Sequence, residues 1–202
     1  MERKCRILAA SDLHGDHRIA QRLAEKSVIE DVDLVLLCGD LTHFDTNVEG
    51  MIGPFVKKGK PVFFVPGNHD SLSTAEFLAR KYNVKNIDGY GIMFHDIAFF
   101  GCGGANIGPH LRDEDEITEY LERSVSSIEH ATKKVMVTHV HPSGGTVEEL
   151  TFPGSDAVRR AIEKFKPDIH VSGHIHDTEG TVEKMGKTTV ICTGKYGTIF
   201  EI

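Results

Sequence analysis

The chain has 202 residues, 40% of them hydrophobic, and this is enough to bury a full core as one domain, which we expect to span residues 1–202. Its formal net charge of -7 disfavours extended nucleic-acid binding, because contact with a phosphate backbone needs clustered Lys and Arg. Apolar runs such as 34–38 are too short to span a bilayer, and the N-terminal residues lack the apolar core of a signal peptide. We therefore expect a soluble, cytoplasmic protein with no membrane partner; the pattern defines no oligomeric state.

Strand-like and helix-like segments alternate along the first half of the chain, as in a layered α/β fold. A first strand is predicted at 6–10. Continuous Val, Leu and Phe runs suit strands covered on both faces and predict the next strands at 33–38 and 60–65. Helices are predicted at 16–30, 48–56 and 71–82. For the helix at 71–82, Ser71 or Ser73 can cap the start, and Glu76 follows Ser73 by three residues, as a capping box requires.

The second half of the chain continues the alternation and ends in several short strands. Segments 90–94 and 97–101 flank His95-Asp96 and predict a β-hairpin. Further helices are predicted at 113–130 and 155–165, and further strands at 135–138 and 168–172. The tail alternates like antiparallel strands at 181–184, 188–193 and 198–202, and we expect 181–202 to complete a second sheet. The predicted fold is α/β, with a two-sheet β-sandwich flanked by helices.

The four cysteines are scattered and form no Cys-x-x-Cys pair: Cys5, Cys38, Cys102 and Cys192. Three of them lie in or at the end of apolar runs, so we interpret them as small core residues. A disulfide framework is not expected in a chain of this size that can form its own core.

Five short polar clusters follow apolar runs, and they carry the chemistry of the chain. They read Asp12-Leu13-His14, Gly39-Asp40, Gly67-Asn68-His69-Asp70, Thr138-His139 and Gly173-His174-Ile175-His176. Ligand sites in open α/β sheets form beyond the carboxyl ends of the strands, so we expect the clusters to converge. Together they supply seven oxygen or nitrogen ligands, a mixed set suited to two divalent cations rather than one structural zinc.

These clusters, in this order, resemble the pattern of the calcineurin-like metallophosphoesterase family. The resemblance implies that Asp12, His14, Asp40 and His176 hold one metal ion, and that Asp40, Asn68, His139 and His174 hold the other. Asp40 would bridge two divalent transition-metal ions, because a carboxylate has two oxygens to share between cations. The resemblance favours Mn or Fe, and Zn, Ni and Co also suit imidazole ligands.

The resemblance also implies a mechanism in which a metal-bridging hydroxide attacks phosphorus and His69 assists the leaving group, with His69 and Asp40 as the catalytic residues. The chain departs from part of the family, since His43 stands three residues after Asp40, where Ser/Thr protein phosphatases have Asp and then Arg. The Tyr that purple acid phosphatases place after the bridging Asp is also missing. Both activities are therefore disfavoured, and Asp45 or Asp70 is left as the candidate that orients His69.

Two loops beside the predicted site are candidates for substrate contact. One spans 101–111 and contains Asn106 and His110, and the other spans 140–154 and contains His141. No cluster supports a role for the histidines that we assign to the surface or the core, namely His17, His95, His130 and His170. His43 lies beside the site, and its role is left open.

The sequence therefore predicts a metal-dependent phosphoesterase, with phosphodiesterase activity favoured and a small phosphoester, possibly a nucleotide, as its substrate. The alternatives are a phosphomonoesterase or nucleotidase, a nuclease resembling DNA-repair relatives, and a metal-free scaffold for protein contacts. The acidic composition disfavours the nuclease. The intact ligand clusters disfavour the scaffold.

Overall fold

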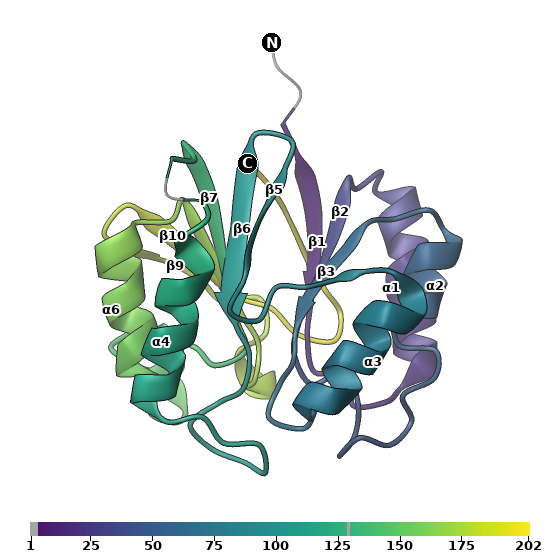
Figure 1. Ribbon diagram of the computed structural model, residues 1–202, viewed down its shortest axis with the longest axis horizontal. Helices are drawn as coiled ribbons and strands as arrows, with labels where there is room; N and C mark the ends of the chain where they lie inside the picture. Colours follow the sequence, from purple (N-terminus) through teal and green to yellow (C-terminus); the bar gives the residue numbers. More distant parts are fainter. Residues whose placement is uncertain (1–3, 129) are drawn as a thin grey trace.

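Two β-sheets lie face to face between two layers of helices in the computed structural model, which describes residues 4–128 and 130–202 (Figure 1). The first sheet has the order β11-β1-β2-β3-β4 and is built from Thr198–Glu201, Arg6–Ala10, Leu34–Cys38, Val62–Val65 and Lys85–Asn86. Strands β1 to β4 run parallel, and β11 is antiparallel to β1. The predicted α/β sandwich is confirmed.

The second sheet is also mixed, with antiparallel strands at both edges. Its order is β5-β6-β7-β8-β10-β9, built from Gly91–Phe94, Ile97–Cys102, Lys133–Thr138, Ile169–Ser172, Thr188–Cys192 and Val182–Met185. Strands β6, β7, β8 and β10 run parallel, so their carboxyl ends meet at one edge. The predicted hairpin of β5 and β6 is confirmed, with His95 in a left-handed conformation at its turn.

Helices cover the outer face of each sheet. In Figure 1, α1 (His17–Ile29), α2 (Gly53–Lys57) and α3 (Leu72–Tyr82) lie on the right, and α4 (Glu114–Val125) and α6 (Asp156–Phe165) lie on the left. Buried residues from both sheets form the central core, including Leu36, Phe63 and Phe99. Among the described residues, no helix is long and apolar enough to cross a membrane.

Strand register places the carboxyl ends of the parallel strands level with one another. Cys38 is opposite Val65 in the first sheet, and Cys102 is opposite Thr138 in the second. The loops that follow these strands therefore begin at the same edge of the sandwich, where the polar clusters of the sequence are found.

The tail differs from its prediction, because 181–202 does not all join the second sheet. Strands β9 and β10 do, but β11 crosses back and pairs with β1, Arg6 lying opposite Glu201. In addition, β10 is parallel to β8 and antiparallel only to β9. An alternating pattern defines the two faces of a strand but not its partner, which explains the error.

Two helix boundaries also differ from their predictions, and one further helix was not predicted. Helix α2 begins at Gly53 rather than at 48, because Gly50 takes a φ of 81° and Pro54 suits only the first helical turn. Helix α4 ends at Val125 rather than at 130, and the hydroxyl of Ser126 bonds to the Arg123 carbonyl. The loop 140–154 contains a short helix, α5 (Thr146–Leu150), which was not predicted.

Helix α3 is capped differently from the predicted capping box. Ser71 is the N-cap, and its side chain accepts a hydrogen bond from the Thr74 backbone N–H. Glu76 instead forms an exposed ion pair with Arg80 at 2.8 Å. A capping box is found at α4, where Asp113 and Glu116 bond reciprocally.

Candidate metal centre

The predicted ligands come together at the carboxyl edge of the sandwich, in two groups. Asp12, His14 and His176 form one group, and Asp40, His139 and His174 form the other; within each group the ligand atoms lie within 4.8 Å of one another. Each group combines residues that follow strands of the first sheet with residues that follow strands of the second. Asn68 joins the second group, with its Oδ1 3.0 Å from His139 Nε2.

The carboxylate of Asp40 lies between the two groups. Its Oδ2 is 3.4 Å from Nε2 of His139, in its own group, and 3.7 Å from Nε2 of His14, in the other group. The same oxygen is 3.9 Å from Nε2 of His69, and Oδ1 accepts a hydrogen bond of 2.8 Å from the His69 backbone N–H. This is the position that the resemblance implies for a bridging ligand.

Four of the candidate ligands have a left-handed backbone that L residues rarely adopt. The φ angles are 57° at Asp12, 44° at His14, 51° at Asp40 and 76° at His174. Hydrogen bonds between loops hold these conformations: the Asp12 N–H donates to the Gly39 carbonyl at 3.0 Å, and the His14 N–H to the Asp40 carbonyl at 2.9 Å. Such strain costs about 1–3 kcal/mol per residue and is concentrated at functional sites.

Two glycines next to candidate ligands allow the loops to approach closely. A Cβ on Gly67 would lie 2.0 Å from Asp40 Oδ1, and a Cβ on Gly39 would lie 2.4 Å from His139 Nδ1. No side chain can occupy either position without displacing a candidate ligand.

The two carboxylates among the candidate ligands, Asp12 and Asp40, are buried and yet ionised at neutral pH. Burial alone would raise the pKa of Asp12, but the adjacent His176, whose Nε2 lies 3.6 Å from Asp12 Oδ1, and the charge of His139 hold it below its usual value. Burial opposes ionisation of Asp40 too, and the adjacent His139 overcomes it, so the pKa of Asp40 is lowered. Both side chains are therefore in the form that binds a cation.

The imidazoles divide into two rings whose pKa is lowered, His14 and His174, and two whose pKa is raised, His139 and His176, the latter by its interaction with Asp12. Burial lowers the pKa of His174 to about 3, and it also lowers the pKa of His14, so both rings carry free lone pairs. Burial would lower the pKa of His139 as well, but the charge of Asp40 outweighs it and raises this pKa to about 9. A cation bound beside Asp40 would displace the proton of His139.

Asp70 was one of two candidates for orienting His69. It bonds to the backbone around His69 and not to the His69 ring. Its buried carboxylate accepts hydrogen bonds from the backbone N–H groups of Leu41, Thr42 and Gly67 at 3.0, 2.8 and 2.9 Å. The Nδ1 of His69 is buried and has no hydrogen-bond partner among the described residues. Neither Asp70 nor Asp45, whose Oδ1 accepts from the Ser71 N–H, bonds to the His69 ring.

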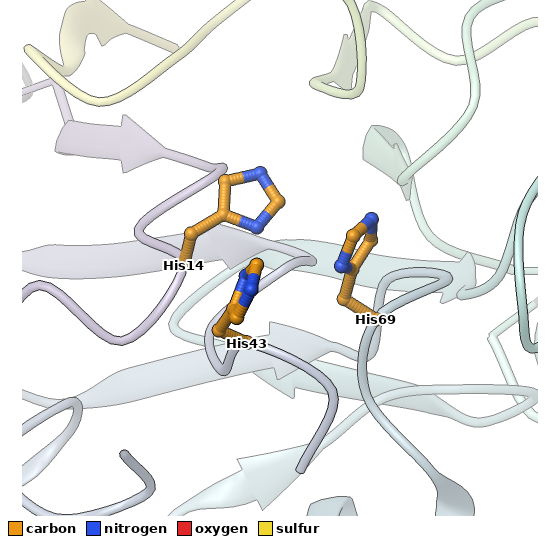
Figure 2. Close-up of side chains that lie close together, drawn as sticks. All are labelled: His14, His43 and His69. Atoms are coloured by element: carbon orange, nitrogen blue, oxygen red, sulfur yellow. The ribbon is translucent and has the colours of Figure 1, made fainter. Parts of the chain in front are cut away.

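A third group consists of His14, His43 and His69, and it brings His43, whose role the sequence left open, beside two predicted site residues. These rings come from three different loops and converge on one space (Figure 2), with ligand atoms within 4.8 Å of one another. The rings of His43 and His69 are stacked with centroids 6.0 Å apart, and the half-exposed ring of Phe44 lies 4.3 Å from that of His69. No pattern in the sequence pointed to Phe44.

The three predicted substrate contacts take different positions. His110 is exposed, and its Nε2 lies 3.6 Å from Asp45 Oδ2 at the edge of the site. Asn106 Nδ2 donates to the Gly154 carbonyl at 3.4 Å, which links the two loops. His141 is only 1% exposed and its Nε2 lies 3.1 Å from the Phe152 carbonyl, so in this structure it holds the loop backbone and does not face solvent.

The remaining histidines agree with their assignment to surface or core. His17, His95 and His130 are exposed, and His170 is fully buried with Nε2 2.8 Å from the Thr138 hydroxyl. All four cysteines are buried in the core, and burial raises the pKa of the Cys192 thiol to about 11.

The donor set suits two divalent transition-metal ions. Carboxylate oxygens are combined with imidazole nitrogens and one amide oxygen. Oδ1 of Asp12 is buried with no hydrogen-bond partner among the described residues. A buried, ionised oxygen without a donor is costly in a protein interior, and a cation relieves that cost. The residues present therefore fit a dinuclear centre.

A sandwich of two mixed sheets with Asp, Asn and His gathered at the strand ends is the architecture of metallophosphoesterases. Residues 5–178 match the sequence model of the family described as calcineurin-like phosphoesterase, and the chain therefore belongs to that family. The uncharacterized protein MJ1162 of Methanocaldococcus jannaschii is 27% identical over 202 residues, covering 95% of this chain and 88% of that protein.

Solved structures share the fold. TT1561 of Thermus thermophilus superposes with a TM-score of 0.80 at 17% identity, covering 96% of this chain and 91% of that chain. A structure described as a novel archaeal phosphodiesterase superposes with a TM-score of 0.56 at 17% identity, covering 98% of this chain and 99% of that chain. These likenesses concern the fold.

Proposed function

We propose that this protein is a dinuclear metal-dependent phosphodiesterase that hydrolyses a small phosphoester. The observation that carries the proposal is the pair of adjacent ligand groups, with the Asp40 carboxylate within 3.7 Å of a ring nitrogen in each. Membership of the calcineurin-like phosphoesterase family supports it. Two bound divalent cations, with Mn or Fe favoured, would supply Lewis acidity at the phosphoryl oxygens and an activated water.

The side chains of the chain have distinct roles in this proposal. Asp40 would be shared by the two ion sites, and its Oδ1 accepts a hydrogen bond from the His69 backbone N–H, which ties the carboxylate to the loop that carries the acid. His69 lies beside Asp40, with Nε2 3.9 Å from the carboxylate, and donates a proton to the leaving oxygen. The burial of Asp40 and His139, which are 2% and 0% exposed, excludes water from the far side of the centre.

The charge of the surrounding loops favours a diester over a monoester. The loops after β1, β2, β3, β6, β7, β8 and β10 contain two cationic residues between them, Arg112 and Lys195. The guanidinium of Arg112 is buried against Asp88 and cannot reach a substrate. A diester carries one negative charge and a monoester up to two, so a site with so few cations beyond its metal ions suits the diester better.

The proposal is tested by hydrolysis of an aryl phosphodiester and the matching monoester by metal-stripped protein, with and without added Mn²⁺. We expect Mn²⁺-dependent turnover that favours the diester and is abolished in Asp40→Asn. Asp96→Asn is the matched control, because this Asp lies on the β5–β6 turn and is 66% exposed, far from the candidate ligands. Preference for the monoester would replace the proposal with a phosphomonoesterase. No turnover and no bound metal would favour the scaffold.

A further inference from the structure

An unusual turn places an aromatic side chain beside His69. His43 and Thr46 pair through backbone hydrogen bonds of 3.3 and 3.0 Å, which leaves Phe44 and Asp45 as the two central residues. Their φ angles are 51° and 59°, the combination of a type I′ turn, where Asn, Asp and Gly are preferred. A bulky residue with positive φ is a genuine outlier, so the backbone at Phe44 is strained.

The neighbouring residues hold this strained turn in place. Asp45 Oδ1 accepts a hydrogen bond of 2.8 Å from the Ser71 N–H, and the Asp45 N–H donates to the Thr42 hydroxyl at 3.2 Å. The Thr42 hydroxyl in turn donates to the buried carboxylate of Asp70 at 2.7 Å. The position of Phe44 is therefore fixed relative to His69, and strain that is maintained in this way points to function.

Phe44 has a buried half and an exposed half. Its ring contacts His69 at 4.3 Å and His43 at 4.6 Å between centroids, yet the residue is 49% exposed. Because His69 is the proposed donor to the leaving oxygen, a leaving group bound beside His69 would lie close to the Phe44 ring. Ile107, 48% exposed, lies on the loop whose His110 reaches Asp45.

The two segments on this side of the site carry no fixed positive charge. Segments 41–48 and 103–111 contain neither Lys nor Arg. A leaving group that carried a further phosphate would meet no compensating charge from these segments, whereas an uncharged planar ring can stack on Phe44.

We propose that Phe44 forms a leaving-group subsite for an uncharged alcohol that carries an aromatic ring, such as a phenol or a nucleoside without a further phosphate. The inference rests on the proposed function and names the substrate class of that site. In the reaction, water adds its hydroxyl to phosphorus and the bond from phosphorus to the alcohol oxygen breaks. That oxygen takes a proton from His69, which regains one from the attacking water.

The test compares two methyl phosphodiesters whose leaving alcohols have similar acidity, phenol and hexafluoroisopropanol. Phe44→Leu keeps an apolar contact with His69 but removes the ring. Phe77→Leu is the matched control, because Phe77 is 51% exposed on helix α3, where it packs against Lys81. We expect Phe44→Leu to raise KM for the phenyl ester about three- to tenfold, the range that ring contacts are worth, with kcat nearly unchanged. The fluoroalkyl ester and the control should show no change.

A second measurement does not depend on turnover. Saturation-transfer NMR with phenol, the uncharged leaving alcohol itself, should show saturated ring protons with metal-free wild-type protein and with Phe77→Leu. The signal should be weakened several-fold with Phe44→Leu. Equal signals from the wild type and Phe44→Leu would overturn the subsite.

The kinetic outcomes separate this inference from the proposed function. An equal loss of kcat on both esters in Phe44→Leu would mean that Phe44 acts only by holding His69, and the subsite would be wrong. Unchanged kinetics on both esters would also overturn it. If the wild type hydrolyses neither ester with metal present, the proposed function fails, and the NMR measurement alone decides whether the aromatic subsite exists.

Discussion

Arg112 belongs to a buried ion pair that anchors the loop beside the candidate centre, and its removal tests how that loop is held. Nη1 and Nη2 donate to the two oxygens of Asp88 at 2.6 and 2.7 Å, and the two side chains are only 8% and 3% exposed. Nη1 also donates to the Gly103 carbonyl at 3.1 Å, and the guanidinium carbon lies 3.9 Å from the centre of the Tyr120 ring. Truncation of Arg112 leaves a buried carboxylate without its partner.

We expect Arg112→Met to lower the free energy of unfolding by about 3–5 kcal/mol, the usual cost of a buried charge that loses its partner. Adding Asp88→Asn removes that charge, so the double variant should regain about 1–3 kcal/mol. Arg80→Met is the control: it breaks an exposed pair with Glu76 of similar length, 2.8 Å, and should change stability by less than about 0.5 kcal/mol.

Equilibrium unfolding in urea, followed by circular dichroism, measures all four proteins on one scale. The reasoning is wrong if Arg112→Met costs no more than Arg80→Met. It is also wrong if the double variant is less stable than Arg112→Met, because the stranded carboxylate would then not be the source of the loss.

Three further predictions concern the site and its surroundings. His69→Ala should keep its bound metal and lose about 10²- to 10⁴-fold in kcat on a poor leaving group, and unchanged kcat would remove its role as the acid. Gly67→Ala should lose bound metal, measured by mass spectrometry, because the new methyl would lie 2.0 Å from Asp40 Oδ1, whereas Gly59→Ala, with nothing within 4 Å, should keep it. Burial lowers the pKa of His170 from 6.5 to about 3, so as pH falls below 6.5 the unfolded chain takes up a proton that the folded protein does not. Metal-free wild type should therefore lose about 2 kcal/mol more stability between pH 7.5 and 5 than His170→Gln in urea titrations, and equal losses would contradict this.

Much of the fold follows from local signals in the sequence. The strands β1, β2 and β3 are continuous apolar runs that end at or just before a small or turn-forming residue, and such runs are buried on both faces whatever the rest of the chain does. The partner of β11 could not be predicted, because Thr198–Glu201 carries the same alternation as an edge strand of either sheet. Only the packing of the completed sandwich decides between the two edges.

The candidate site divides in the same way. The convergence of its candidate ligands could be predicted, because each lies within a few residues after a strand end and parallel strands bring their ends together. Asp88 and Arg112 are 24 residues apart in sequence and lie in no motif, so their pairing depends on the tertiary fold. Phe44 was not predicted either, because an aromatic residue is unexpected at a turn position with positive φ.

The two ligand groups have a consequence for how the protein is held together. Asp12 and His176 belong to the same group but are 164 positions apart, and one follows a strand of the first sheet while the other follows a strand of the second. A cation held by both acts as a cross-link between the sheets and closes a loop that includes most of the chain. Such a closure restricts the unfolded chain more than a short one does, and ligand binding to the folded state adds to its stability. Ion affinity and the stability of the sandwich would thus be thermodynamically linked, so that a bound ion would strengthen the contact between the two sheets that their shared core already provides.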